Sequence, residues 1–187
     1  PSPIISCLGK MNDVDKAITM SFKKINSKIF MVGKRKDELG GSLYYSLFGE
    51  LGANVPSPDL NEVKDQIHAI TDCIDNELIE SCHDISDGGI AVALSEMTFE
   101  YNIGCSVTIP GTLPIEKLLF SETGGFIIEV ENSNTENVKE IFNKHNINLK
   151  LIGETSKDQK LVVNNAVNME VEEMKSLWTN GLRDKIK

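Results

Sequence analysis

The sequence predicts an α+β fold, a three-layer α/β/α sandwich built around a mixed sheet. Short apolar runs alternate with amphipathic helical segments almost to the end of the chain, and no internal repeat interrupts them. Most of the apolar runs are nearly continuous, which is typical of strands in a sheet that is covered on both faces. A chain of 187 residues is long enough for one substantial core. We therefore expect a single domain over residues 1–187, in which residues 1–20 form a linker and an incoming strand.

Seven segments have the composition of strands. Each is rich in apolar residues and is bounded by Gly, Pro, Asn or Asp, which favour turns. The predicted strands are Ile4 to Leu8, Lys28 to Val32, Ser81 to Ile85, Cys105 to Ile109, Gly125 to Val130, Leu149 to Ile152 and Lys160 to Val163.

The helices have clearer signals than the strands. Apolar residues follow helical spacing from Leu60 to Asn76, and Asp59 with Glu62 can cap the N–H groups of the first turn. Ser133 and Glu136 repeat this capping pattern ahead of another apolar stripe. Two further helices are predicted from Gly89 to Tyr101 and from Val171 to Trp178.

The overall charge argues against two classes of partner. The chain has 28 acidic and 19 basic residues and a net charge of −9, which repels nucleic acid and anionic lipid. The sequence also contains no apolar run whose length approaches the roughly 20 residues that a membrane span requires. We therefore expect no nucleic-acid partner and no membrane. A small anionic metabolite remains compatible, because backbone N–H groups can hold it locally.

The cysteines and the first residues indicate where the chain belongs. Cys7, Cys73, Cys82 and Cys105 lie far apart without a C-x-x-C pair, so neither a zinc site nor a disulfide framework is expected. Reduced thiols favour a cytoplasmic protein. Residues 1–3 read Pro-Ser-Pro without an initiator Met, which favours an excised domain.

One segment has the pattern of a strand, a turn and a helix that could meet a ligand. Paired glycines, Gly88 and Gly89, permit close approach of a backbone, and the following helix offers unpaired N–H groups. Asp84 and Asp87 are weak candidates for a metal site. The alternative is structural, with Ser86 or Asp87 capping the helix and no ligand present.

Two other segments carry weaker signals. Gly40, Gly41 and Ser42 precede an apolar stretch, where they fit either a phosphate cradle or a capped helix, and we favour the capped helix. Ser121 and Glu122 precede a predicted strand, where a carboxylate is usually only solvated. No Ser/His/Asp arrangement, zinc cluster or Walker loop can be assembled, so no catalytic residue is expected.

Taken in order, these segments resemble the second, large subunit or domain of phosphoribosylformylglycinamidine synthase. This family belongs to the aminoimidazole ribonucleotide synthetase-like superfamily. The resemblance covers nearly the whole chain. The matching segments are Pro1 to Ile5, Asp13 to Met20, Glu38 to Ser42, His83 to Gly89, Ala91 to Met97, Leu119 to Glu122, Leu151 to Glu154 and Leu177 to Trp178.

The resemblance implies that the chain is the C-terminal domain of a multidomain synthase with two homologous halves. The complete enzyme would use ATP and magnesium to amidate formylglycinamide ribonucleotide with ammonia from a glutaminase subunit or domain. The isolated domain should bind neither ATP nor magnesium and should be inactive. Its partners should be the homologous first-half domain and the glutaminase, and a homodimer is expected once the domain is excised.

The resemblance also assigns candidate binding residues. In the family's first half, the loop matching Ser121 and Glu122 helps to hold substrate. That loop commonly carries an Arg after the Glu, whereas residues 123–126 here contain none, so a phosphate clamp is missing. We therefore favour a structural half. The candidates for substrate or nucleotide binding are Gly40, Gly41, Ser42, Asp84, Ser86, Asp87, Gly88, Gly89, Ser121 and Glu122.

Three functional hypotheses remain open at this point. The chain is a domain of an ATP-dependent ligase, or a non-catalytic assembly module that completes a pseudo-symmetric body, and these two are compatible. It could also belong to another enzyme of the aminoimidazole ribonucleotide synthetase-like superfamily. A free-standing ligand-binding protein is disfavoured by the linker-like start.

Overall fold

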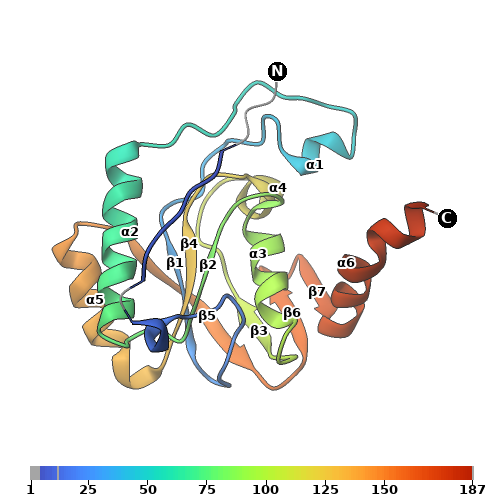
Figure 1. Ribbon diagram of the computed structural model, residues 1–187. Coiled ribbons are helices and arrows are strands. Elements are labelled where there is room, and N and C mark those ends of the chain that lie inside the picture. The colour runs from blue at the N-terminus through green and yellow to red at the C-terminus, as the bar shows by residue number, and fades with distance from the viewer. Residues whose placement is uncertain (1–4, 12, 187) are drawn as a thin grey trace.

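The computed structural model describes residues 5–11 and 13–186, with side chains described up to residue 181. Its centre is a seven-stranded mixed sheet with the strand order β2-β4-β1-β5-β3-β6-β7 (Figure 1). All neighbours in this sheet are antiparallel except β3 and β6, which are parallel. The strands are β1 (Lys28–Val32), β2 (Ser81–Asp84), β3 (Gly104–Val107), β4 (Phe126–Val130), β5 (Leu149–Ser156), β6 (Lys160–Val163) and β7 (Val167–Glu170).

Helices lie on both sides of this sheet (Figure 1). One side carries α2 and α5, and the other carries α3, α4 and α6. The helices are α1 (Leu43–Ser46), α2 (Leu60–Asp75), α3 (Gly89–Thr98), α4 (Ile115–Phe120), α5 (Thr135–Lys144) and α6 (Val171–Ile186), with 3-10 turns η1 (Val14–Lys16) and η2 (Asn132–Asn134).

Strand β1 contributes side chains to both hydrophobic cores of the molecule. Ile29 and Met31 pack into the core under α3, α4 and α6, whereas Phe30 and Val32 pack into the core under α2 and α5. All four side chains are at most 2% exposed. The near-continuous apolar run that predicted a sheet covered on both faces is confirmed at this strand.

One face of the sheet is exposed from β5 onward, on the side where α2 and α5 cover the other strands. In β3, Cys105 and Val107 are buried beneath α3 and α6, whereas Ser106 between them is exposed. Leu151 of β5, opposite Phe30, is 53% exposed. Here the sheet has the alternation of an antiparallel sheet with one solvated face. The third layer therefore covers only the half of the sheet that contains β2, β4 and β1.

Six of the seven predicted strands are confirmed within a few residues. The predicted strand from Ile4 to Leu8 is wrong where the structure describes it, since residues 5–8 have no regular structure and Ile4 lies outside the described ranges. Ile5 and Leu8 are 88% and 97% exposed, so no strand edge receives them. The incoming chain touches the sheet only later, through a bridge between Thr19 and Ser81.

One of the two predicted capping patterns is confirmed. Asp59 Oδ1 accepts hydrogen bonds from the backbone N–H groups of Asn61 and Glu62, at 2.9 and 3.4 Å. Ser133 does not cap α5, because the chain enters that helix through the 3-10 turn η2, which contains Ser133 itself. The N-cap is Asn134, whose side chain makes no capping bond.

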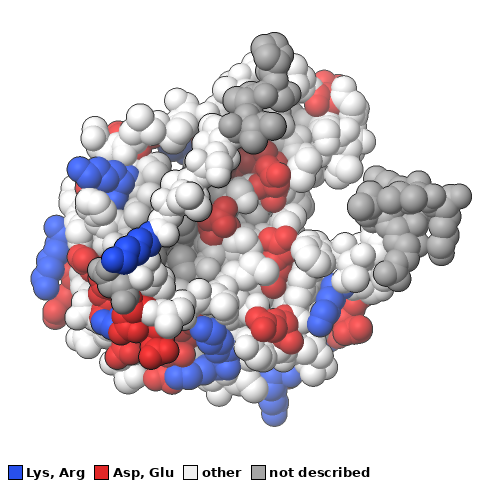
Figure 2. All heavy atoms as spheres, in the orientation of Figure 1, with Lys and Arg blue, Asp and Glu red and all other residues white. Residues whose placement is uncertain are grey.

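The surface carries charges of both signs. On the face drawn in Figure 2, acidic and basic side chains of the described residues are interspersed and form no continuous basic patch. Within the described ranges, no helix is long and apolar enough to cross a membrane.

Candidate functional site

The three glycine- and hydroxyl-bearing segments singled out in the sequence meet at one side chain, that of Glu122. Its Oε1 atom accepts hydrogen bonds from the backbone N–H of Leu43, at 2.8 Å, and of Gly88, at 2.9 Å. Leu43 is the first residue of α1, and Gly88 is the N-cap of α3. One half-buried carboxylate therefore joins the starts of two helices that lie far apart in the sequence.

The paired glycines ahead of α3 are required by close packing. Gly88 and Gly89 have left-handed φ angles of 77° and 68°. A Cβ atom on Gly89 would lie 2.6 Å from the carbonyl oxygen of Leu119, and one on Gly88 would lie 2.4 Å from a methyl group of Val92. The turn uses its glycines to bring the start of α3 against the end of α4, which accounts for them without a ligand.

The expectation that Ser86 or Asp87 caps α3 is wrong. Both residues are exposed, and the N-cap position belongs to Gly88, which has no side chain. Ser86 contributes only its carbonyl oxygen, which accepts the N–H of Gly89 at 3.0 Å. The N–H of Gly88 at the helix start donates to Glu122, in a loop 34 residues away.

Asp84 forms part of a second polar cluster rather than a metal site. Its Oδ1 lies 3.2 Å from Nδ1 of His83, and Nε2 of His83 lies 2.9 Å from Oε2 of Glu96. The other Glu96 oxygen accepts a hydrogen bond from the indole N–H of Trp178, at 3.1 Å. This chain of contacts ties β2 to α3 and α6. Among the described residues, no group of three His, Cys, Asp or Glu side chains is placed to hold a metal ion.

The Gly40, Gly41 and Ser42 segment has its N–H groups occupied within the chain. Gly40 and Gly41 donate to the carbonyl oxygens of Asn54 and Leu51, both at 2.7 Å. Ser42 caps α1, since its Oγ accepts the N–H of Tyr45 at 3.3 Å. The capped-helix interpretation of this segment is confirmed, and the N–H groups of Gly40, Gly41 and Ser42 all have acceptors within the chain.

The loop of Ser121 is held by an arginine that no sequence motif identified. Arg35 donates from its guanidinium to the backbone oxygens of Ser121, Thr123 and Gly124, at 3.2, 2.5 and 3.2 Å. Burial lowers the pKa of Arg35 to about 10, against the opposing effect of Glu38, so it is charged at neutral pH. An Arg thus does reach this loop from a distant part of the sequence, but it binds backbone carbonyl oxygens and does not act as a phosphate clamp.

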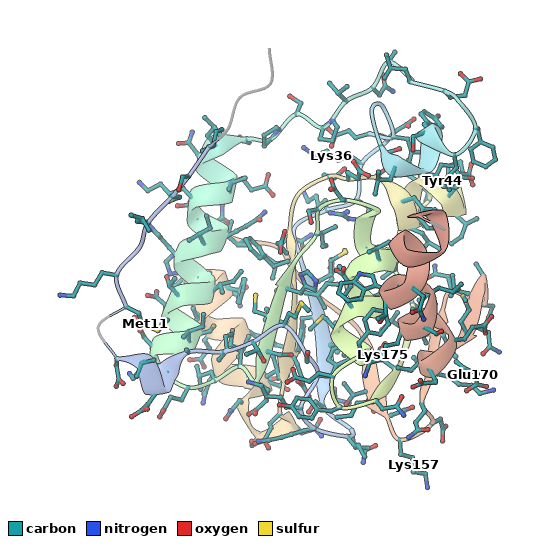
Figure 3. All side chains as sticks on the ribbon, turned by 45° about the vertical axis from the view of Figure 1, so that its right-hand side comes forward. Met11, Lys36, Tyr44, Lys157, Glu170 and Lys175 are labelled. Atoms are coloured by element: carbon teal, nitrogen blue, oxygen red, sulfur yellow. The ribbon has the colours of Figure 1, made fainter. Side chains whose placement is uncertain are left out.

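A cavity of about 230 Å³ adjoins this loop. Figure 3 shows Lys36 and Tyr44 at the same end of the molecule, near α1. The charged side chains that line the cavity are Lys34, Lys36, Glu38, Asp59, Glu62 and Glu122. Four carboxylates against two ammonium groups disfavour a polyphosphate. A larger open hollow of about 720 Å³ lies along residues 143–151, away from all three segments.

Three of the four cysteines offer no nucleophile at neutral pH. Burial raises the pKa values of Cys73, Cys82 and Cys105 to about 12, so these side chains are thiols. Cys7 is exposed, and all four cysteines are free.

Comparison with known proteins gives consistent matches over most of the chain. The profile of the family described as "AIR synthase related protein, C-terminal domain" matches residues 24–164. Phosphoribosylformylglycinamidine synthase subunit PurL of Methanothrix thermoacetophila is 37% identical over 98% of this chain, and that of Thermococcus sibiricus is 32% identical over 96%. The chain covers only 25% and 26% of these relatives.

Solved structures of low sequence identity share the fold. A structure described as "T. maritima PurL complexed with FGAR" superposes with a TM-score of 0.75 over 87% of this chain and 30% of that chain, at 17% identity. Another, "T. maritima PurL complexed with ATP", superposes with a TM-score of 0.68 over 87% of this chain and 28% of that chain, also at 17% identity. The profile match shows that the chain belongs to the family of AIR synthase related protein C-terminal domains, and the sequence identity with the PurL relatives agrees with this.

Proposed function

We propose that this chain is the C-terminal domain of a phosphoribosylformylglycinamidine synthase. The complete enzyme would amidate formylglycinamide ribonucleotide in purine biosynthesis with consumption of ATP. The observation that carries the proposal is that the relatives match nearly all of this chain, whereas this chain matches only part of each relative. PurL relatives align with 96–98% of this chain, while the chain accounts for about a quarter of each of them. Two structures that share the fold are described as PurL complexed with FGAR and with ATP, which supports the choice of substrate and cofactor.

Within that enzyme, we assign this domain a structural role. The N–H groups of Gly40, Gly41, Leu43, Gly88 and Gly89 are bonded inside the chain, to Asn54, Leu51, Glu122 and Ser86. Asp84 is paired with His83, and among the described residues no three His, Cys, Asp or Glu side chains are placed to hold a metal ion. These residues therefore do not fit magnesium or the phosphates of ATP, and we place both ligands in other parts of the enzyme. This observation favours the assembly module over a ligand-binding half.

The proposed partners are the homologous first-half domain and a glutaminase that supplies ammonia. The proposed location of the enzyme is the cytoplasm, which is a reducing compartment. A structure that shares the fold is described as "PurLQS from Thermotoga maritima", which supports an assembly of several subunits. The surface of this chain is suited to further packing. Apolar side chains from the α1 region onward are more than half exposed: Leu43, Leu47, Phe48, Leu51, Val55 and Leu60.

A chimeric enzyme tests the proposed function. The last quarter of the Methanothrix PurL relative is replaced by this chain, and ammonia-dependent formation of formylglycinamidine ribonucleotide is measured. We expect activity in the chimera and none in a control from which the last quarter is deleted. A soluble chimera that is folded by circular dichroism but inactive would contradict the proposal.

The isolated chain tests the structural role separately. We expect it to form no formylglycinamidine ribonucleotide from ATP, substrate and ammonia, and to self-associate through its exposed apolar side chains. Sedimentation velocity measures the second expectation. Activity of the purified chain would refute the structural role, and a strict monomer at high micromolar concentration would refute self-association.

A further inference from the structure

We propose that Glu122 is a positioning residue whose carboxylate makes the two glycine turns behave as one unit. The turns are separated by more than 40 residues, and no hydrogen bond between described residues joins them directly. They are joined through Glu122 Oε1, which accepts the N–H of Leu43 after one turn and the N–H of Gly88 in the other. Both distances, 2.8 and 2.9 Å, are those of charge-assisted hydrogen bonds.

The loop that carries Glu122 is itself fixed. The guanidinium of Arg35 binds three of its carbonyl oxygens, and the Nε atom of Arg35 is buried without a partner among the described residues. Ser121 is fully buried, and its Oγ donates to the carbonyl of Lys36 at 2.8 Å. Thr123 Oγ1 donates to Oε2 of Glu38, also at 2.8 Å. The loop therefore positions the Glu122 carboxylate through contacts that do not involve the two glycine turns.

These contacts form a closed circuit. Residues 35–38 form hydrogen bonds with the loop that carries Glu122, and they are followed in the sequence by the first glycine turn at Gly40. That turn ends at Leu43, whose N–H returns to Glu122, and Glu122 then reaches Gly88 at the start of α3. A displacement of any one segment breaks a bond in the next. Because Gly88 is buried, loss of the carboxylate would leave its N–H unpaired.

Glu122 is one of the residues that the family resemblance places among the candidates for substrate binding. Glu122 acts here as an internal anion that satisfies the donors to which an external anion would bind. Its role follows from contacts within this chain and stands whether or not the amidation proposal does.

A pH titration of the intact chain by ¹H–¹⁵N NMR tests the proposal. The amide resonances of Leu43 and Gly88 should follow one common carboxyl transition, because both N–H groups donate to the same oxygen atom. The transition should disappear from both resonances in Glu122→Gln. It should persist in Glu50→Gln, whose carboxylate makes no bond to another described residue. Two separate transitions in the wild-type chain, or an unchanged transition in Glu122→Gln, would overturn the proposal.

Amide hydrogen exchange adds a readout of coupling. Loss of a charged acceptor should raise the exchange rates of Leu43 and Gly88 together, by about tenfold or more, in Glu122→Gln. Acceleration at only one of the two turns would contradict their behaviour as one unit. The wild-type titration requires no variant and decides the question if Glu122→Gln does not fold.

Discussion

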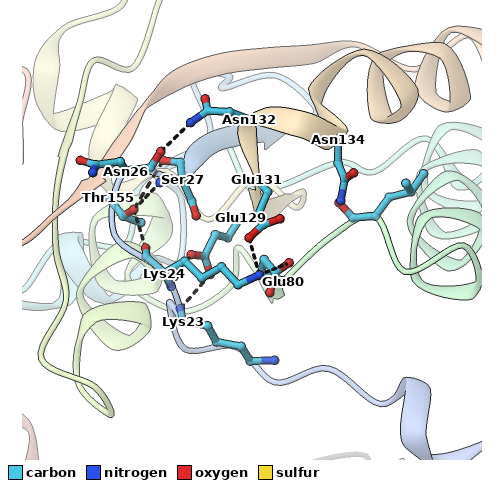
Figure 4. A network of polar contacts seen from close by, with 11 residues as sticks. Lys23, Lys24, Asn26, Ser27, Glu80, Glu129, Glu131, Asn132, Asn134 and Thr155 are labelled. Atoms are coloured by element: carbon cyan, nitrogen blue, oxygen red, sulfur yellow. Dashed lines mark hydrogen bonds and ion pairs between the residues drawn. The ribbon is translucent and has the colours of Figure 1, made fainter.

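Two carboxylates, one just before β4 and one within it, both bind backbone N–H groups of segments that are distant in the sequence. Glu122 precedes the strand and binds the N–H groups of Leu43 and Gly88. Glu129 lies near the end of the strand and binds the N–H groups of Lys23 and Lys24, both at 2.9 Å. Glu129 also accepts the hydroxyl of Ser81 at 3.0 Å and is fully buried, in the polar network of Figure 4.

The difference between them lies in how the sequence presents them. Glu122 stands beside hydroxyls and glycines in a segment that resembles a substrate-binding loop. Glu129 stands in the strand Phe-Ile-Ile-Glu-Val, where no motif marks it. In the structure, both carboxylates accept hydrogen bonds from backbone N–H groups of segments that are distant in the sequence. A motif of this kind therefore indicates a ligand site only where the donors around it are unbonded.

Removal of Glu129 should have the largest effect. Glu129→Leu leaves two backbone N–H groups and a buried hydroxyl without an acceptor, and it should lower the free energy of unfolding by about 3 kcal/mol or more. Urea denaturation measures this loss. The control is Glu131→Gln, which alters a partly exposed ion pair with Lys24 and should cost less than about 1 kcal/mol. Equal losses in the two variants would contradict the role of Glu129.

A pair of glycine variants should separate close packing from backbone conformation. Gly89→Ala meets the backbone of Leu119 and Phe120 at a left-handed φ, and it should cost about 2 kcal/mol or more. Gly41→Ala has a similar φ of 75° but no atom within 4 Å of the new Cβ, so it should cost about 1 kcal/mol. Thermal unfolding at matched concentration compares them. An equal or smaller cost at Gly89 would show that the turn is not packed against α4.

Asp87→Ala should have the smallest effect. Asp87 is exposed and makes no hydrogen bond to another described residue, so the change in unfolding free energy should stay within about 0.5 kcal/mol. A loss of about 1 kcal/mol, which is typical of a missing helix cap, would mean that Asp87 caps α3 after all.

The sequence predicted most of the fold but little of the polar chemistry that holds it together. Strong periodicity predicted the helix after Asp59, and continuous apolar runs predicted β1 and β4. It missed α4, whose six residues are too few for a helical period to show, and β7, where the polar Asn168 and Glu170 interrupt the apolar pattern. It also missed Arg35, since a buried arginine that serves a loop more than 80 residues away has no local signature.

The three motif segments were found in the sequence, but their meeting at Glu122 was not. Hydrogen bonds that span 34 and 79 residues depend on how the helices pack, which local pattern does not encode. Neither Ser86 nor Asp87 is the expected cap, because the N-cap is Gly88, the Gly88 N–H donates to Glu122 and the Gly89 N–H donates to the Ser86 carbonyl.

The most direct test of this account is whether the glycine turns have donors left for a phosphate. The ¹H–¹⁵N spectrum of the wild-type chain is followed during titration with inorganic phosphate and with ATP and magnesium, up to millimolar concentrations. We predict that the amide resonances of Gly40, Gly41, Leu43 and Gly88 stay in place, because their acceptors lie within the chain. A saturable shift of the Gly88 and Leu43 resonances would show that a ligand displaces Glu122 and would contradict the structural role.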